Sequence, residues 1–184
     1  MLVFSEYQTD TIDLALDFYG YEDCPKNYEF GPSVRDNFVL HFITEGKGVF
    51  HFNKKEIHLE TGDLFLLPKN KVTYYKADAE EPWSYYWIGI SGTKVSDFMR
   101  FSTLHEKGFL KKTEVETEKI GQFMERLVHK AEASKMTSHY QLHLLSQIYE
   151  LLFLISEVAP DIHRSHPSPT YQLYLTCKHV IETH

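Results

Sequence analysis

The strongest structural signal in the chain lies in residues 38–68, which read FVLHFITEGKGVFHFNKKEIHLETGDLFLLP. Short apolar runs alternate here with turn residues, a pattern typical of successive β-strands. Gly46 and Gly48 can adopt positive φ and predict a tight hairpin between the first two strands. Pro68 ends the fourth strand because it cannot donate a ladder hydrogen bond. Continued to residue 90, the pattern predicts strands at 38–44, 49–52, 56–59, 64–67, 72–76 and 84–90.

Such closely spaced strands predict a small antiparallel barrel or sandwich. The pattern changes after Gly92, where apolar residues at three- and four-residue steps indicate amphipathic helices at about 95–99 and 120–131. A third helix, 138–158, is apolar on more than one face, so several surfaces must cover it. One cover could be a second subunit; alternatively, the helix wedges between the barrel and the preceding helix. The fold class is therefore α+β.

The same patterns divide the chain into three parts. Residues 1–92 are expected to form the barrel, whose apolar stretch 2–21 either covers the barrel mouth as an arm or completes the sheet as an edge strand. Residues 93–159 are expected to form the helical region. Residues 160–184 begin with a linker by composition, and another helix starts at Tyr171. That helix suggests the first element of a further domain, and an ordinary C-terminal helix is the alternative.

The composition is that of a soluble globular protein, with 42% hydrophobic and 24% charged residues in 184. The net charge of −7 argues against DNA binding by this chain itself, because phosphate contacts need Lys and Arg. Cys24 and Cys177 have no CxxC spacing and are expected to be free thiols in a reducing compartment. The start shows no secretory signal, and the purest apolar run, 151–155, is far shorter than the ~20 residues of a membrane helix. We therefore expect a cytoplasmic protein without membrane contact.

Three segments together carry a family resemblance. They are FGPSVRDNFVLHF (30–42) followed by EGKG (45–48), then LETGDLFLLP (59–68), and EPWSYYWIG (81–89). In this order and at these spacings they resemble the sensor domains of AraC-type transcription regulators, in particular sugar-responsive regulators of oligosaccharide use in Gram-positive bacteria. The resemblance covers essentially the whole chain.

The resemblance implies a cupin-like antiparallel β-barrel (a double-stranded β-helix or jelly roll) followed by an α-helical dimerisation pair. It implies a small-molecule effector, expected to be a saccharide, and an N-terminal arm that folds over it. It also implies a homodimer through helices between residues 114 and 158. DNA would bind only through a C-terminal helix-turn-helix domain that this chain lacks.

Cupin barrels also house enzymes, and a cupin-type sugar isomerase or epimerase is the alternative function. A metal-binding cupin needs an HxH pair, a following Glu and a later His. The matching strand offers only His51, and Thr73 and Tyr75 stand where the later His would fall. His51, Glu56 and His58 form a loose cluster that is more simply interpreted as surface residues. We therefore predict no catalytic residue, no metal and no cofactor.

Strand alternation predicts a ligand-binding face instead. Tyr85 and Trp87 share one face of their strand, and Tyr75 and His41 lie on neighbouring strands of the predicted barrel. Aromatic rings stack on the C–H faces of a sugar, and polar tips hydrogen-bond to its hydroxyls. The resemblance points to the same positions for Tyr75, Tyr85 and Trp87, and Arg35 could close the rim. The expected ligand-binding residues are Arg35, His41, Tyr75, Tyr85 and Trp87, with core packing as the alternative for each aromatic.

Overall fold

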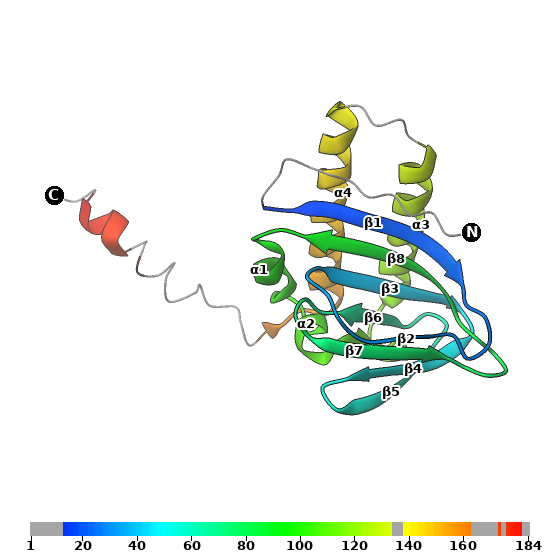
Figure 1. Ribbon diagram of the computed structural model, residues 1–184. Coiled ribbons are helices and arrows are strands. Elements are labelled where there is room, and N and C mark those ends of the chain that lie inside the picture. Colours follow the sequence, from blue (N-terminus) through cyan, green and yellow to red (C-terminus); the bar gives the residue numbers. More distant parts are fainter. Residues whose placement is uncertain (1–12, 134–137, 163–172, 174–175, 182–184) are drawn as a thin grey trace.

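The structure, a computed structural model, describes residues 13–133, 138–162, 173 and 176–181. Its strands form two antiparallel sheets that face each other in the predicted jelly-roll barrel (Figure 1). The five-stranded sheet has the order β1 (Ala15–Asp23), β8 (Ser84–Ser91), β3 (Phe38–Glu45), β6 (Leu64–Leu67) and β9 (Phe109–Leu110). The four-stranded sheet has the order β2 (Glu29–Val34), β7 (Val72–Ala77), β4 (Lys47–Phe52) and β5 (Lys55–Glu60).

Every strand predicted between residues 38 and 90 is confirmed, whereas β2 and β9 were not predicted. β1 confirms the edge-strand alternative for residues 15–23, since it lies at the end of its sheet and, among the described strands, pairs with β8 alone. The part of the expected arm that falls in residues 1–12 lies outside the described residues.

The predicted hairpin at Gly46 is wrong. β3 pairs with β6 and β8, while β4 pairs with β5 and β7, so the chain passes from one sheet to the other at this turn. Gly46 has a φ of 71°, and a side chain there would run into the Pro82 carbonyl. The actual hairpin follows β4, where Asn53 and Lys54 have φ values of 51° and 63°, as a two-residue I′ turn requires. Turn chemistry therefore located the reversal of the chain but did not identify the partner strand.

Side chains of the five-stranded sheet alternate between two separate cores. On β8, Tyr85 and Trp87 belong to the core inside the barrel, while Tyr86 and Ile88 belong to the core beneath the helices. On β3 the same alternation holds, and it turns His41 towards the aromatic rings of the barrel interior. The period-two pattern thus assigns each strand residue to one core or the other.

The helices cover the outer face of the five-stranded sheet, with the two long ones side by side (Figure 1). They are α1 (Val95–Met99), α2 (Leu104–Lys107), α3 (Thr117–Ala133) and α4 (Ser138–Val158). The predicted helices at 95–99, 120–131 and 138–158 are confirmed, and α2 is a short addition. None of the described helices is long and apolar enough to cross a membrane. The helix expected from Tyr171 is described in part, and its described residues, 173 and 176–181, are helical.

α4 buries one side and leaves an apolar stripe on the other. Ile148 and Leu151 are buried in the core beneath the helices, whereas Leu142, Tyr149 and Phe153 are 71%, 46% and 63% exposed. The exposed three are separated by seven and four residues, which places them along one side of the helix. The helix is therefore wedged against the barrel and the preceding helix, as one interpretation expected, and it still presents apolar surface; cover by a second subunit stays a prediction.

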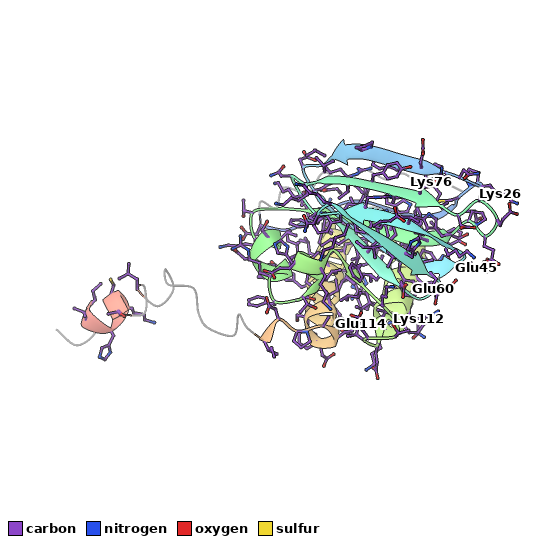
Figure 2. All side chains as sticks on the ribbon, turned by 90° about the horizontal axis from the view of Figure 1, so that it is seen from below. Lys26, Glu45, Glu60, Lys76, Lys112 and Glu114 are labelled. Carbon is purple, nitrogen blue, oxygen red and sulfur yellow. The ribbon has the colours of Figure 1, made fainter. Side chains whose placement is uncertain are left out.

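The turn before β6 anchors the helical region to the barrel. The Asp63 carboxylate accepts hydrogen bonds from the backbone N–H groups of Glu60 and Lys112, each at 3.0 Å. The Thr117 hydroxyl, at the start of α3, donates to the Gly62 carbonyl at 2.6 Å. An ion pair of 3.1 Å between Lys112 and Glu60 lies at the surface of the same junction (Figure 2).

Candidate functional site

A cavity of about 160 Å³ lies inside the barrel between the two sheets. All five predicted residues line it, namely Arg35, His41, Tyr75, Tyr85 and Trp87. Arg35 comes from the loop between β2 and β3 and is half-buried, whereas the other four are buried side chains of β3, β7 and β8. The structure therefore brings the predicted set together at one place, and its role in binding an effector stays a prediction.

The cavity also has lining residues that the sequence interpretation did not name. They are Phe18, Glu22, Tyr28, Phe30 and Val39. Val39 could have been found, because it shares a strand face with His41. Phe18 and Glu22 could not, because a bulge between Leu16 and Phe18 breaks the period-two pattern of β1.

His41 is a buried, neutral imidazole. It is 3% exposed, stacks on Phe65 with ring centroids 4.4 Å apart, and meets the Tyr85 ring edge-on at 4.9 Å. Burial, and then the nearby charge of Arg35, lower the pKa of His41 to about 3. Its Nδ1 has no hydrogen-bond partner within the described part of the chain. Buried polar atoms are rarely left unpartnered, so this atom is a notable exception in the cavity wall.

Two tyrosine hydroxyls and a carboxylate form a connected chain in the wall. Tyr75 Oη lies 3.2 Å from Tyr85 Oη, which lies 3.3 Å from Glu22 Oε2. A carboxylate can only accept, so Tyr85 donates to Glu22 and accepts from Tyr75. Burial raises the pKa of both tyrosines and of Glu22. Cys24, also hydrogen-bonded to Tyr85, is a buried free thiol whose pKa burial raises to about 12.

Arg35 supplies the cationic edge of the cavity. Its guanidinium carbon lies 4.7 Å from the ring centroid of Phe30 and 5.8 Å from that of Phe18, within the range of cation–π contacts. Its buried Nε has no hydrogen-bond partner among the described residues. The side chain thus lies against two rings while its buried Nε makes no hydrogen bond with the described residues.

The histidine cluster lies apart from this cavity, on the hairpin of β4 and β5. Glu56 lies 3.3 Å from His58 and 3.9 Å from His51, so His51 faces Glu56 across the hairpin rather than His58. Among residues 13–133, 138–162, 173 and 176–181, no three His, Cys, Asp or Glu side chains are grouped to hold a metal ion. The buried Thr73 and Tyr75 are poor ligands for the usual divalent metals.

Larger hollows exist on the outside of the barrel. One of about 540 Å³ is lined by Pro32, His51, Asn53 and Lys71 among others, and most of its residues are exposed or half-buried. Water can already hydrogen-bond to the polar groups of such an exposed hollow. The smaller barrel cavity has buried polar atoms without partners, so the chemistry rather than the volume favours it as a binding site.

Comparison with known proteins agrees with this geometry. Residues 15–152 match the family model described as AraC-like ligand binding domain. The Msm operon regulatory protein of Streptococcus mutans is 35% identical over 173 residues, which are 94% of this chain and 61% of that protein. The raffinose operon transcriptional regulatory protein RafR of Pediococcus pentosaceus is 41% identical over 100 residues, which are 53% of this chain and 36% of that protein.

The Cnp3 cupin domain of Schizosaccharomyces pombe is a far more distant structural likeness, with a TM-score of 0.40 and 15% identity over 53% of this chain and 69% of that one. The chain spans about three fifths of the length of its Streptococcus relative. The family model, in contrast, covers all of the barrel strands from β1 to β8 together with α3 and most of α4. The chain belongs to the family of AraC-like ligand-binding domains.

Proposed function

We propose that this domain binds a saccharide effector in the barrel cavity and thereby regulates a DNA-binding part of a larger transcription regulator. The observation that carries the proposal is a cavity with aromatic walls and buried polar atoms, His41 Nδ1 and Arg35 Nε, that lack partners among the described residues. A sugar satisfies both features, since its C–H faces stack on rings and its hydroxyls hydrogen-bond. The similarity to a raffinose operon regulator supports a sugar as the effector.

The size of the cavity favours recognition of a single ring. A cavity of roughly 150 Å³ is enough for one benzene molecule, and the volume here is about 160 Å³. Pockets for larger organic ligands measure about 300–1,000 Å³. An oligosaccharide would therefore place one ring inside and the rest at the half-buried rim formed by Tyr28, Phe30 and Arg35.

A sensing role fits the lining better than the alternative of a sugar isomerase or epimerase. Proton transfer needs a group that titrates near neutral pH within reach of the substrate. His41 is held neutral, with a pKa of about 3, and burial raises the pKa of Tyr75 and Tyr85 away from neutrality. Glu22 is the remaining carboxylate in the lining, and a single carboxylate with no second acid or base is a weak catalytic set.

A homodimer is the second part of the proposal, and α4 is the surface that would make it. The outer face of α3 is charged, with Glu118, Lys119 and Arg126 exposed, whereas α4 exposes the apolar stripe of Leu142, Tyr149 and Phe153. Burying such a stripe against a second copy is favourable by about 25 cal/mol per Å². Within the expected segment 114–158, the contact should therefore fall on α4.

The dimer can be tested by sedimentation equilibrium at micromolar concentration. Phe153→Glu should dissociate it, because the substitution places a charge on the apolar stripe. Gln122→Glu adds the same charge to the polar face of α3 and should leave the dimer intact. A monomeric wild-type chain would reject this part of the proposal.

The effector can be identified by calorimetric titration of the chain with mono-, di- and trisaccharides. A saccharide that binds the wild type and fails to bind Trp87→Ala supports the cavity as its site. Gel-shift assays of this chain beside its full-length parent, on the upstream DNA of the parent's operon, then test regulation. Only the full-length protein should bind DNA, and the effector should change its affinity, because a ligand shifts a conformational equilibrium by its differential affinity for the two states.

A further inference from the structure

Glu22 is a carboxylate that lies in the cavity wall, where the sequence pattern did not predict an acidic side chain. Glutamate side chains are mostly exposed in folded proteins, yet Glu22 lines the cavity and is half-buried. We infer that Glu22, by balancing Arg35, makes the cavity selective for uncharged sugar rings over the corresponding uronic acids. The inference rests on the proposed saccharide site and specifies which sugars that site accepts.

The charge balance of the lining is the first support. Arg35 is the only cationic side chain and Glu22 the only anionic one among the residues that line the cavity within the described chain. His41 adds no charge at neutral pH, because its pKa lies near 3. The cavity wall is therefore neutral as a whole. Transfer of a ligand carboxylate from water into it costs desolvation that the opposing charges of Arg35 and Glu22 do not offset.

The positions of the two charges are the second support. No ion pair within 4.0 Å joins Arg35 to Glu22 in the described chain, and Arg35 instead lies over the rings of Phe30 and Phe18. Each group therefore remains open to a different part of a ligand. Arg35 can donate to a hydroxyl or ring oxygen, and Glu22 can accept from a hydroxyl. A neutral sugar provides both kinds of group on one ring.

The direction of the hydroxyl chain is the third support. The Tyr75 proton points to Tyr85 and the Tyr85 proton points to Glu22 Oε2, as the distances of 3.2 and 3.3 Å and the carboxylate's lack of a donor require. Among the described residues, no other hydrogen bond engages this carboxylate. Its Oε1 consequently remains an acceptor without a partner in the described part of the chain. A hydroxyl of a neutral ring can donate to this carboxylate, whereas the carboxylate of a uronate can only accept and carries the same charge as Glu22.

The test uses the whole chain and calorimetric titration with defined probes. These are the methyl α-glycosides of D-glucose and D-galactose, the corresponding uronates, and the uronamides, which have the shape of the uronates without their charge. In wild type, the better neutral glycoside should bind at least about tenfold more tightly than its uronate, and the uronamide should recover most of that loss. A uronamide as weak as the uronate would overturn the inference, because shape rather than charge would then explain the exclusion.

The substitution Glu22→Gln keeps the shape of the side chain and removes its charge. It should weaken binding of the neutral glycoside about tenfold, since a charge-assisted hydrogen bond is lost. It should also strengthen binding of the uronate, because Arg35 then acts on the ligand without a compensating anion. The ratio of the two affinities should therefore fall by about a hundredfold or to the point of reversal.

Asp23→Asn is the matched control. It removes the same charge one residue further along β1, where Asp23 is exposed, accepts from Ser84 at 2.8 Å and does not line the cavity. It should leave the affinity ratio of wild type unchanged. An unchanged ratio in Glu22→Gln would overturn the inference and leave the saccharide site in place. A wild type that binds no saccharide of either kind would overturn the proposed function itself, and this inference with it.

Discussion

The two faces of the five-stranded sheet are built from alternate residues of the same strands, yet they differ in chemistry. The face beneath the helices is largely aliphatic, with Leu66 and Ile88 fully buried. The face inside the barrel carries His41, Tyr85 and Trp87 around a cavity. Aliphatic packing stabilises by removing surface from water and leaves nothing for a ligand to add. Buried polar atoms without partners gain when a ligand supplies them. One face therefore stabilises the fold and the other is suited to binding.

The largest effect should come from the face beneath the helices. Ile88→Ala removes a side chain that is fully buried there and should lower the free energy of unfolding by about 2–5 kcal/mol. Urea denaturation measures the loss. Sugar affinity, measured where the variant is folded, should stay within about twofold of wild type, because adjacent residues on a strand face opposite sides. A large loss of affinity would show that the two faces are not independent.

The neighbouring substitution should give the reverse outcome. Trp87→Ala removes a ring from the cavity wall, so the sugar should no longer stabilise the protein. In wild type that stabilisation is about 2.7 kcal/mol at a hundredfold excess over Kd. Thermal unfolding with and without sugar measures it, and the variant should still unfold cooperatively. If sugar still stabilised Trp87→Ala, Trp87 would be a core-packing residue and not part of a binding site.

The pH dependence of stability should separate the faces further. The pKa of His41 is lowered to about 3 in the folded chain, whereas an unfolded histidine titrates near ~6.5. As pH falls below that value, unfolded chains take up a proton that folded chains refuse. His41 should therefore cost about 1.4 kcal/mol of stability per pH unit between the two pKa values.

His41→Gln should unfold with a correspondingly flatter pH dependence between pH 6 and 4. His58→Gln, a substitution of an exposed histidine on β5, is the control and should follow wild type. The measurement is the denaturation midpoint of wild type and of both variants across this pH range. Parallel curves for wild type and His41→Gln would contradict a neutral, buried His41.

The smallest effect should come from outside both faces. Glu60→Gln breaks the ion pair with Lys112. The side chains of Glu60 and Lys112 are 60% and 44% exposed, so solvent screens the pair, and the free energy of unfolding should fall by less than about 1 kcal/mol. The matched comparison is Asp63→Asn, which weakens two backbone hydrogen bonds at the same junction and should cost more. Equal effects would mean that the surface pair contributes as much as the buried turn.

The alternation of residues 38–90 was enough to predict the strands, the two faces and the shared orientation of Tyr85 and Trp87. It succeeded because β3, β6 and β8 bury alternate residues in two different cores, while β4, β5 and β7 alternate buried residues with exposed or half-buried ones. It failed at Gly46, where turn chemistry indicates that the chain reverses but cannot say which strand it meets next. Pairing in a jelly roll is set by contacts distant in sequence, which a local pattern does not contain.

The cavity-lining residues divide in the same way. Those on regular strands were predicted, His41 from strand parity alone and Tyr75 from parity and resemblance together. Phe18 and Glu22 were not, since the bulge in β1 removes the alternation and a carboxylate on an edge strand has the pattern of a solvent-facing residue. The apolar excess of α4 was correctly noticed, but sequence periodicity alone could not show that it concentrates on the stripe through Tyr149.

β1 touches both cores, and this has a consequence for signalling. One side of the strand contributes Glu22 to the cavity, while Tyr21 on the other side packs on Tyr86 with ring centroids 4.9 Å apart. Tyr86 in turn lies 3.3 Å from Glu125 and 3.2 Å from His129 on α3. A ligand that displaced β1 would therefore also alter the packing under α3. Linkage is reciprocal, so whatever fixes α3 in one position must change the affinity of the cavity by the same factor.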